Sequence, residues 1–247
     1  MKILRVLSAA VLSCMLCATA AHADADVIRV ATDATFPPLE FVKDGQRIGF
    51  DIDLINAIAK TLDRKVEWVD IDFKGLIPGL IARRFDVAAS GIYMTEERRR
   101  VVDFTDPYYK GGLAMLVRRD DPALQAPADL AGRKVSVQVG TKSVDFLKQN
   151  YPTVQRVEVE KNQAMFDLLM IRRVDAAVTG RPAAVQFARS QGGSVRVLDK
   201  GLTTELYGFA LRKDEKDLMT QFNTALQTLH ANGTYARLVA KWFGPSA

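Results

Sequence analysis

Residues 51–71, DIDLINAIAKTLDRKVEWVDI, change their hydrophobic period partway along. The first half places apolar side chains on one helical face, namely Ile55, Ile58, Ala59 and Leu62. Asp51 and Asp53 stand at the start of this helix, where the helix dipole favours negative charge. Residues 65–71 then alternate between polar and apolar, which is the pattern of a strand. A helix that leads directly into a strand is typical of an α/β protein.

The same alternation of strands and helices extends in both directions from this stretch. Upstream, residues 27–31 are β-rich and residues 32–49 are rich in turns, while downstream residues 75–84 predict a helix and residues 86–90 a strand. A second series in the same order follows: strand 134–139, helix 141–150, strand 154–158, helix 162–172, strand 175–179 and helix 181–191. The sequence therefore predicts two α/β units, each with a mostly parallel sheet flanked by helices.

Two further strands connect these units. Residues 113–118 lie between the two series, and residues 206–211 precede the last helical region. If both strands cross between the units, the chain leaves one lobe, builds the other and returns. We therefore expect lobe 1 to comprise residues 24–112 and 207–247, and lobe 2 to comprise residues 113–206 with its hinge strand. A cleft spanned by two hinge strands is where open α/β sheets bind ligands.

The first 23 residues have the features of an export signal. Lys2 and Arg5 form a cationic start, and residues 6–21 carry no charge but are too few to span a bilayer. Residues 21–23, Ala-His-Ala, have the spacing of small residues that a signal peptidase cuts after. The mature chain should therefore begin at Asp24 and reside in the periplasm.

Removal of this segment narrows the chemistry that the protein can perform. Both cysteines, Cys14 and Cys17, lie in it together with His22, which leaves His230 as the one histidine of the mature chain. The residues before the cysteines do not resemble a lipobox, so we interpret both as apolar filler, with lipid modification as the alternative. A disulfide, a cysteine metal site and a Ser-His-Asp triad are not expected. We predict no catalytic residue, no metal and no cofactor.

The charge distribution argues against a nucleic-acid partner. The formal charge of the whole chain is +5, and cleavage lowers it by two because Lys2 and Arg5 leave with the signal. The remaining Lys and Arg residues are interleaved with Asp and Glu instead of forming a basic tract. No second apolar stretch is long enough to cross a membrane.

The segment from Ser90 to Arg98 is a first candidate anion site, where a predicted strand ends and a helix begins. Thr95 is a natural N-cap for that helix. Arginine so close to a helix start opposes the dipole at a cost of a few tenths to about 1 kcal/mol, and a bound anion would reverse this sign. The guanidinium of Arg98 matches a carboxylate in bidentate fashion. A solvated basic face is the alternative, which we favour for Arg99 and Arg100.

The junction from Gly140 to Ser143 is a second candidate, because a strand again gives way to a helix there. Glycine lets a ligand approach the backbone, and the free amides of a helix start can receive a carboxylate. Such junctions are more often plain turns. Phe36 and Phe73 would suit the apolar walls of a cleft, although each alone would suit a core equally well.

These segments resemble the polar amino-acid-binding family of periplasmic solute-binding proteins, family 3 of the bacterial extracellular solute-binding proteins, which serve ABC importers. The matching phrases run through the mature chain in order: residues 31–41 (ATDATFPPLEF), 49–54 (GFDIDL), 72–78 (DFKGLIP), 95–98 (TEER), 103–109 (DFTDPYY) and 139–141 (VGT). The resemblance implies a type II periplasmic-binding-protein-like fold that acts as a monomer. Its two lobes would close over a small solute and then engage a permease.

The resemblance also assigns ligand contacts. Arg98 would grip a carboxylate of the ligand, and Asp33 would contact the polar end of the ligand or its ammonium. Phe36 and Phe73 would enclose the ligand side chain. Backbone groups of two turns would assist Arg98, and these turns contain Ser90, Gly91, Gly140, Thr141, Lys142 and Ser143.

Two positions depart from the family pattern. Tyr93 stands where the family usually has a small hydroxyl residue, and it should reshape the floor of the pocket. Gly180 stands where an acid usually holds the α-ammonium of the ligand. Either another acid, such as Asp33 or Glu205, neutralises the ammonium, or the ligand has no ammonium in that place.

Arg181 follows Gly180 and adds a further positive charge. If it faces the cleft together with Lys142 and Arg98, the site favours an anionic or two-carboxylate solute, and acidic amino acids or dicarboxylates should bind better than lysine and arginine. A solvated Arg181 at a helix start is an equally good interpretation.

Two other classes of function deserve a test. Cyclohexadienyl dehydratases resemble these receptors, and such an enzyme needs a general acid and a general base in the cleft. The sequence offers Glu40, Asp33 and Lys142 but no obvious matched pair. The ligand-sensing domain of a signalling receptor would need a transmembrane segment after residue 247. We therefore expect a binding protein and not an enzyme.

Overall fold

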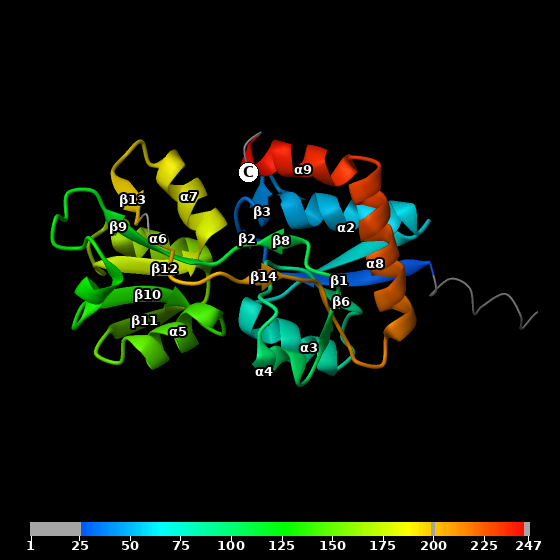
Figure 1. The fold of residues 1–247 in the computed structure, drawn as a ribbon, viewed down its shortest axis with the longest axis horizontal. Coiled ribbons are helices and arrows are strands. Elements are labelled where there is room, and N and C mark those ends of the chain that lie inside the picture. The colour runs from blue at the N-terminus through cyan, green and yellow to red at the C-terminus, as the bar shows by residue number, and fades with distance from the viewer. Residues whose placement is uncertain (1–25, 199–200, 245–247) are drawn as a thin grey trace, which may run out of the picture.

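The computed structural model describes residues 26–198 and 201–244, and the predicted export segment at 1–23 lies outside this part together with Cys14, Cys17 and His22. Figure 1 shows two α/β lobes joined by segments that run between them. Each lobe is built around one five-stranded sheet. The predicted two-lobe α/β fold is confirmed.

The sheet of lobe 1 has the strand order β5-β1-β6-β15-β7. Its strands are β1 (Val27–Thr32), β5 (Lys65–Asp70), β6 (Val87–Ala88), β7 (Asp103–Phe104) and β15 (Ala210–Leu211). β1 pairs in parallel with β5 and β6, whereas β15 runs antiparallel to β6 and β7. The helices of this lobe are α2 (Phe50–Thr61), α3 (Leu76–Ile81), α4 (Glu96–Arg99), α8 (Lys216–Ala231) and α9 (Thr234–Phe243).

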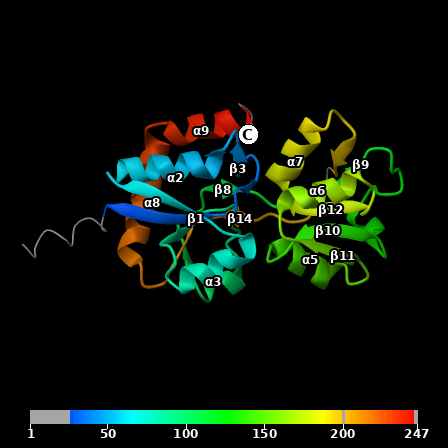
Figure 2. The same cartoon turned by 180° about the vertical axis from the view of Figure 1, so that it is seen from behind.

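The sheet of lobe 2 has the strand order β11-β10-β12-β9-β13. Its strands are β9 (Leu113–Arg118), β10 (Lys134–Gln138), β11 (Gln155–Val159), β12 (Ala176–Gly180) and β13 (Val195–Val197). β10 pairs in parallel with β11 and β12, whereas β9 runs antiparallel to β12 and β13. The sheet is flanked by α5 (Lys142–Asn150), α6 (Asn162–Met170) and α7 (Arg181–Ser190), as Figure 2 shows from behind.

The two sheets share one topology, and it follows from how the chain enters each lobe. In each sheet four strands run the same way and one is reversed, β15 in lobe 1 and β9 in lobe 2. Each reversed strand is the first strand of its sheet that the chain forms after crossing from the other lobe. The chain arrives from the neighbouring lobe at the carboxyl ends of the parallel strands. The first strand that it forms in the new sheet is therefore antiparallel to them. The carboxyl ends of both sheets therefore face each other.

The crossing itself differs from the sequence prediction. Residues 113–118 form β9, whose six residues are all buried inside the sheet of lobe 2. The crossing is made a few residues earlier by β8 (Tyr109–Lys110), which pairs antiparallel with β14 (Leu206–Tyr207). Gly111 N also donates to Glu205 O at 2.8 Å. The predicted strand at 206–211 thus divides into β14 in the crossing and β15 in lobe 1.

The segment at 32–49, predicted to be rich in turns, contains a small antiparallel sheet. Its strands are β2 (Thr35–Phe36), β3 (Glu40–Lys43) and β4 (Gln46–Ile48). Asp44 and Gly45 connect β3 to β4 with φ values of 51° and 74°, which is the backbone that a tight hairpin turn requires. This small sheet carries Phe36 toward lobe 2, where β2 contacts α6.

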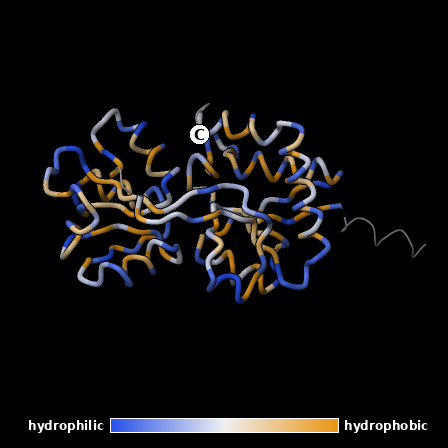
Figure 3. Tube along the Cα trace, in the orientation of Figure 1, coloured by the Kyte–Doolittle hydropathy of each residue, from blue (hydrophilic) through white to orange (hydrophobic). Residues whose placement is uncertain are grey.

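Apolar residues follow the strands and the inner faces of the helices in both lobes, as the hydropathy colours of Figure 3 show. Phe50, Phe209 and Phe222 are fully buried in lobe 1 and Phe166 in lobe 2. Phe209 stacks on Tyr108 with the ring centroids 4.3 Å apart. Each lobe therefore has a packed interior that holds its loops at the interface in place. Within residues 26–198 and 201–244, no helix has both the length and the apolar character needed to cross a membrane.

Candidate functional site

A pocket lies between the lobes, at the carboxyl ends of the parallel strands. Both lobes contribute to its lining: Asp33, Phe36, Phe73, Ser90, Gly91 and Tyr93 from lobe 1, and Leu113, Gln138, Thr141, Lys142, Ser143, Val178, Thr179 and Gly180 from lobe 2. Ten of the thirteen residues singled out from the sequence are in this set.

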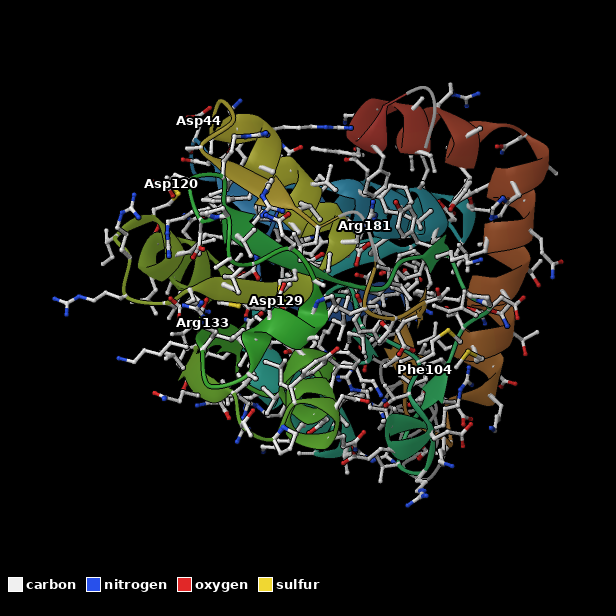
Figure 4. All side chains as sticks on the ribbon, turned by 60° about the vertical axis from the view of Figure 1, so that its left-hand side comes forward. Asp44, Phe104, Asp120, Asp129, Arg133 and Arg181 are labelled. Atoms are coloured by element: carbon white, nitrogen blue, oxygen red, sulfur yellow. The ribbon has the colours of Figure 1, made fainter. Side chains whose placement is uncertain are left out.

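The other three predicted residues lie near this pocket without lining it. Arg98 and Gly140 line an adjoining groove, which shares Thr141 and Lys142 with the pocket. Arg181 lines a separate hinge-side cavity together with Lys110 and other residues. Figure 4 labels Arg181 near the boundary between the lobes. The structure therefore does not place Arg181 with Lys142 in one pocket, as one interpretation of the sequence required.

Arg98 spans the two lobes. Thr95 caps α4 by accepting a hydrogen bond from Arg98 N at 3.3 Å, which fixes the arginine at the helix start as predicted. The guanidinium donates to Tyr93 O at 3.0 Å and to Gly140 O at 3.2 Å, and it lies 5.5 Å from the centre of the Phe73 ring. Burial lowers the pKa of Arg98, but an arginine remains charged. Within residues 26–198 and 201–244 the guanidinium makes these two hydrogen bonds, which leaves three of its five N–H donors for other partners.

The start of α5 offers two backbone amides. Thr141 is the N-cap residue, but its hydroxyl donates to Gln138 O at 2.7 Å and does not cap the helix. The amide of Val144 donates to Thr141 O at 3.1 Å. The amides of Lys142 and Ser143 lie in the first turn of α5, where backbone N–H groups have no acceptor within the helix. They can therefore donate hydrogen bonds to an anion.

Asp33 is already satisfied by the protein. Its side chain is 2% exposed, and both carboxylate oxygens accept two hydrogen bonds each. The donors are Thr35 Oγ1 at 3.1 Å, Lys161 Nζ at 3.1 Å, Phe73 N at 3.1 Å and Gln138 Nε2 at 2.8 Å. Gln138 and Lys161 come from lobe 2, so the carboxylate joins the lobes.

Ion pairs around Asp33 hold the lobes in a closed arrangement. Lys161 Nζ lies 2.6 Å from Asp72 Oδ1, and Lys74 Nζ lies 2.6 Å from Glu160 Oε1. Partial burial lowers the pKa of Lys161, but hydrogen bonds and charge from Asp72 and Asp33 outweigh it and raise that pKa overall. The ammonium is therefore a permanent positive charge between two carboxylates of lobe 1.

The floor of the pocket is a pair of stacked tyrosines. The rings of Tyr93 and Tyr207 lie 4.5 Å apart at an angle of 14°. The Tyr207 hydroxyl donates to the Tyr93 hydroxyl at 3.0 Å, which in turn donates to Gly112 O at 2.9 Å. Burial raises the pKa of both phenols, so they are neutral hydrogen-bonding groups.

A pair of buried acids lies beneath Ser90 and Gly91. Ser90 Oγ donates to Glu40 Oε1 at 2.9 Å, and Gly91 N donates to Asp51 Oδ2 at 2.9 Å. Tyr108 donates to the same oxygen of Asp51 at 2.7 Å. Burial raises the pKa of Asp51 to about 7, and burial together with the charge of Asp51 raises the pKa of Glu40. Glu40, a candidate acid in the enzyme interpretation, is therefore separated from the pocket by Ser90.

Several contributors were missed by the sequence analysis: Leu113, Gln138, Val178, Thr179 and Lys161. The first four lie in strands of lobe 2, and Gln138 and Thr179 lie at or next to carboxyl ends that meet the cleft. The rule that ligands bind at the carboxyl ends of parallel strands would have found these two. No local signal marks Lys161, because its role depends on how the lobes meet.

A cleft lined by the facing strand ends of two lobes, with charged contacts that join the lobes across it, defines a two-lobed protein that closes over a small solute. The chain belongs to the bacterial extracellular solute-binding proteins, family 3, because the model of that family matches residues 28–245. It is 31% identical over 225 residues to the Escherichia coli (strain K12) ABC transporter arginine-binding protein 1, covering 89% of this chain and 91% of that one.

Solved structures agree with this assignment. An ancestral arginine-binding protein bound to arginine superposes with a TM-score of 0.86 at 38% identity, covering 89% of this chain and 99% of that one. An ancestral amino acid-binding protein that is a precursor of cyclohexadienyl dehydratase superposes with a TM-score of 0.84 at 39% identity, covering 89% and 96%. Other curated relatives include the L-arginine-binding protein of Pseudomonas aeruginosa and the histidine-binding periplasmic protein of Salmonella typhimurium.

Proposed function

We propose that this protein binds an amino acid or a related small carboxylate between its lobes and delivers it to the permease of an ABC importer. The observation that carries the proposal is the convergence of anion-binding donors from both lobes. Arg98 comes from lobe 1, and Lys142 with the amide of Ser143 comes from lobe 2. A solute that contacts both sets binds the closed form better than the open form, so it shifts the population toward closure.

The relatives support the periplasmic location and the link to an ABC importer in this proposal. They include amino-acid-binding proteins of ABC transporters and of the periplasm, and this agrees with the export segment predicted at residues 1–23. We propose a periplasmic monomer whose lobe 1 comprises residues 24–112 and 207–247 and whose lobe 2 comprises residues 113–206. The closed lobes would present one composite surface to the permease in the inner membrane.

Replacing Arg98 by alanine tests the proposal. The change should weaken solute binding about a hundredfold, because a buried carboxylate that loses a charge-assisted partner costs roughly 2–3 kcal/mol. Isothermal titration calorimetry against a panel of amino acids and organic acids measures this. Arg99→Ala is the matched control, since Arg99 is exposed on the same helix and faces Phe104. Equal affinity of Arg98→Ala and wild type would remove Arg98 from the site.

A dehydratase is the second candidate, favoured by the likeness to the dehydratase precursor. Its chemistry would need a general acid and a general base at the pocket. Among the lining residues Asp33 is the carboxylate, and it is held by four donors. We therefore propose a non-enzymatic receptor. Incubation with prephenate or arogenate and detection of the aromatic product distinguishes the two functions.

A further inference from the structure

We infer that the solute is a small carboxylate without an α-ammonium group, such as a keto acid, a hydroxy acid or a dicarboxylate. This inference rests on the proposed function and names the class of solute that the same pocket takes. Three features carry it: the charges that line the pocket, the bonding of Asp33, and the space around Gly180.

The charges that line the pocket favour an anion. Lys142 is half-buried in the lining and has no carboxylate within ion-pair distance among the described residues. Arg98 adds a second positive charge from the adjoining groove, where the carboxylates of Asp145, Glu97 and Glu205 partly offset it. In the pocket lining itself Lys142 therefore supplies the positive charge, and it attracts a carboxylate and repels an ammonium.

The negative charge that an ammonium needs is not offered by the lining. Asp33 is the one carboxylate among the fourteen lining residues. Its four hydrogen bonds, including the ion pair with Lys161, use all of its acceptor positions. An ammonium buried beside it would have to displace a donor of the protein, and a buried charge without a partner is strongly unfavourable. Glu205 lines the groove with Arg98 and not the pocket.

The floor also has no room for an acid at position 180. A Cβ atom on Gly180 would lie 2.7 Å from Phe36 Cζ, 2.7 Å from the Tyr207 hydroxyl and 3.2 Å from the Tyr93 hydroxyl. Real Cβ atoms do not approach other atoms to 2.7 Å. Phe36 and the tyrosine pair therefore occupy the space in which a side chain at 180 would have to stand. Its two hydroxyls are neutral, and their protons are already donated.

Matched pairs of solutes test the inference on the unaltered mature chain. Suitable pairs differ only at the α-carbon: 2-oxoglutarate against L-glutamate, succinate against L-aspartate, and phenylpyruvate against L-phenylalanine. By calorimetry at pH 7.5, the member without an ammonium should bind at least about tenfold more tightly in every pair that binds. Tighter binding of the amino acids would overturn the inference and leave the proposed function intact. Absence of binding by every compound would overturn both.

A multiple variant tests the structural cause. Gly180→Asp supplies a carboxylate beside the solute, and Phe36→Leu, Tyr207→Phe and Tyr93→Ser remove the three atoms that its Cβ would meet, so this variant should reverse the preference toward the amino acid by about tenfold or more. The variant with the three aromatic changes and Gly180 kept is the matched control, because it opens the same space without adding charge and should keep the preference for the compound without an ammonium. Reversal by the control, or an unchanged preference in a multiple variant that melts cooperatively, would contradict the inference.

Discussion

Replacing Lys161 by methionine removes an ammonium that joins the lobes, and we expect it to weaken solute binding about tenfold. Lys161 Nζ lies 3.1 Å from Asp33 Oδ1, and the two side chains are 45% and 2% exposed. Methionine keeps the length of the side chain and loses the charge and the donors. The contact exists only while the lobes are closed, so its loss acts on the closing equilibrium and not on the interior of either lobe.

The magnitude follows from the exposure of the two partners. A hydrogen bond to a charged group contributes about 1.5–3 kcal/mol when it is buried, and an exposed ion pair contributes about 0–1 kcal/mol. Lys161 is nearly half exposed, and Asp33 keeps its bonds from Gln138, Phe73 and Thr35 in the variant. The lower end of the buried range therefore applies, about 1.5 kcal/mol, which is about tenfold in affinity.

Lys74→Met is the matched control for this experiment. Lys74 also crosses the cleft, but it and its partner Glu160 are 51% and 52% exposed, so we expect less than about a threefold change. Calorimetric affinity for the tightest solute of the panel gives both numbers, and the melting temperature of the solute-free protein should change in neither variant. Equal losses in the two variants, or no loss for Lys161→Met, would refute the argument from burial.

Three further changes test other parts of the structure. Asp86→Ala should lower the free energy of unfolding by about 1–2 kcal/mol, because Asp86 accepts two side-chain hydrogen bonds and one backbone hydrogen bond from Arg29. Burial raises the pKa of Asp86, but the bonds and charge of Arg29 lower it overall. The difference in free energy of unfolding between Asp86→Ala and the wild type, measured by urea unfolding, should therefore shrink as the pH falls below about 4. Glu40→Gln tests a pH dependence of the opposite sign. The pKa of Asp51 is raised to about 7, and the pKa of Glu40 is raised as well. Wild-type stability therefore falls as the pH rises from about 4 to about 7. Urea unfolding at pH 5 and pH 8 should show a smaller fall in the free energy of unfolding for Glu40→Gln than for the wild type. Arg98→Lys keeps the charge but loses the paired donors and the contact with Phe73, so calorimetry should place its affinity about tenfold below wild type and above that of Arg98→Ala.

The sequence predicts most of the fold because the relevant signals are local. The period change at 51–71 corresponds to α2 and β5, and Thr95 caps α4 as its chemistry requires. The junctions at Ser90 and at Gly140 both occur where a strand reaches the cleft. Residue types at strand ends are therefore informative about the pocket before any coordinates exist.

The parts that were missed depend on contacts between distant residues. Residues 113–118 form a wholly buried strand, and burial on both faces is decided by neighbours that come later in the chain. Lys161 and Asp33 are separated by 128 positions, and their ion pair exists only because α6 meets β2 across the cleft. The sequence analysis expected Asp33 to contact the ligand. In the structure Gln138 and Lys161 of lobe 2 donate hydrogen bonds to its carboxylate, and no local sequence pattern predicts these contacts.

The floor of the pocket shows why assigning roles one residue at a time fails here. Tyr207 lies in the crossing strand β14, and Tyr93 donates to Gly112 O in the opposite crossing segment, so the floor is built partly from the connection between the lobes. Phe36, Tyr207 and Tyr93 together leave space at position 180 for glycine alone. An acid at 180 would therefore require changes at Phe36 and Tyr207 as well as at Tyr93, because a side chain added at 180 alone creates a clash. The glycine at 180 is thus tied to three aromatic neighbours, and together they fix both the shape and the charge that the solute meets.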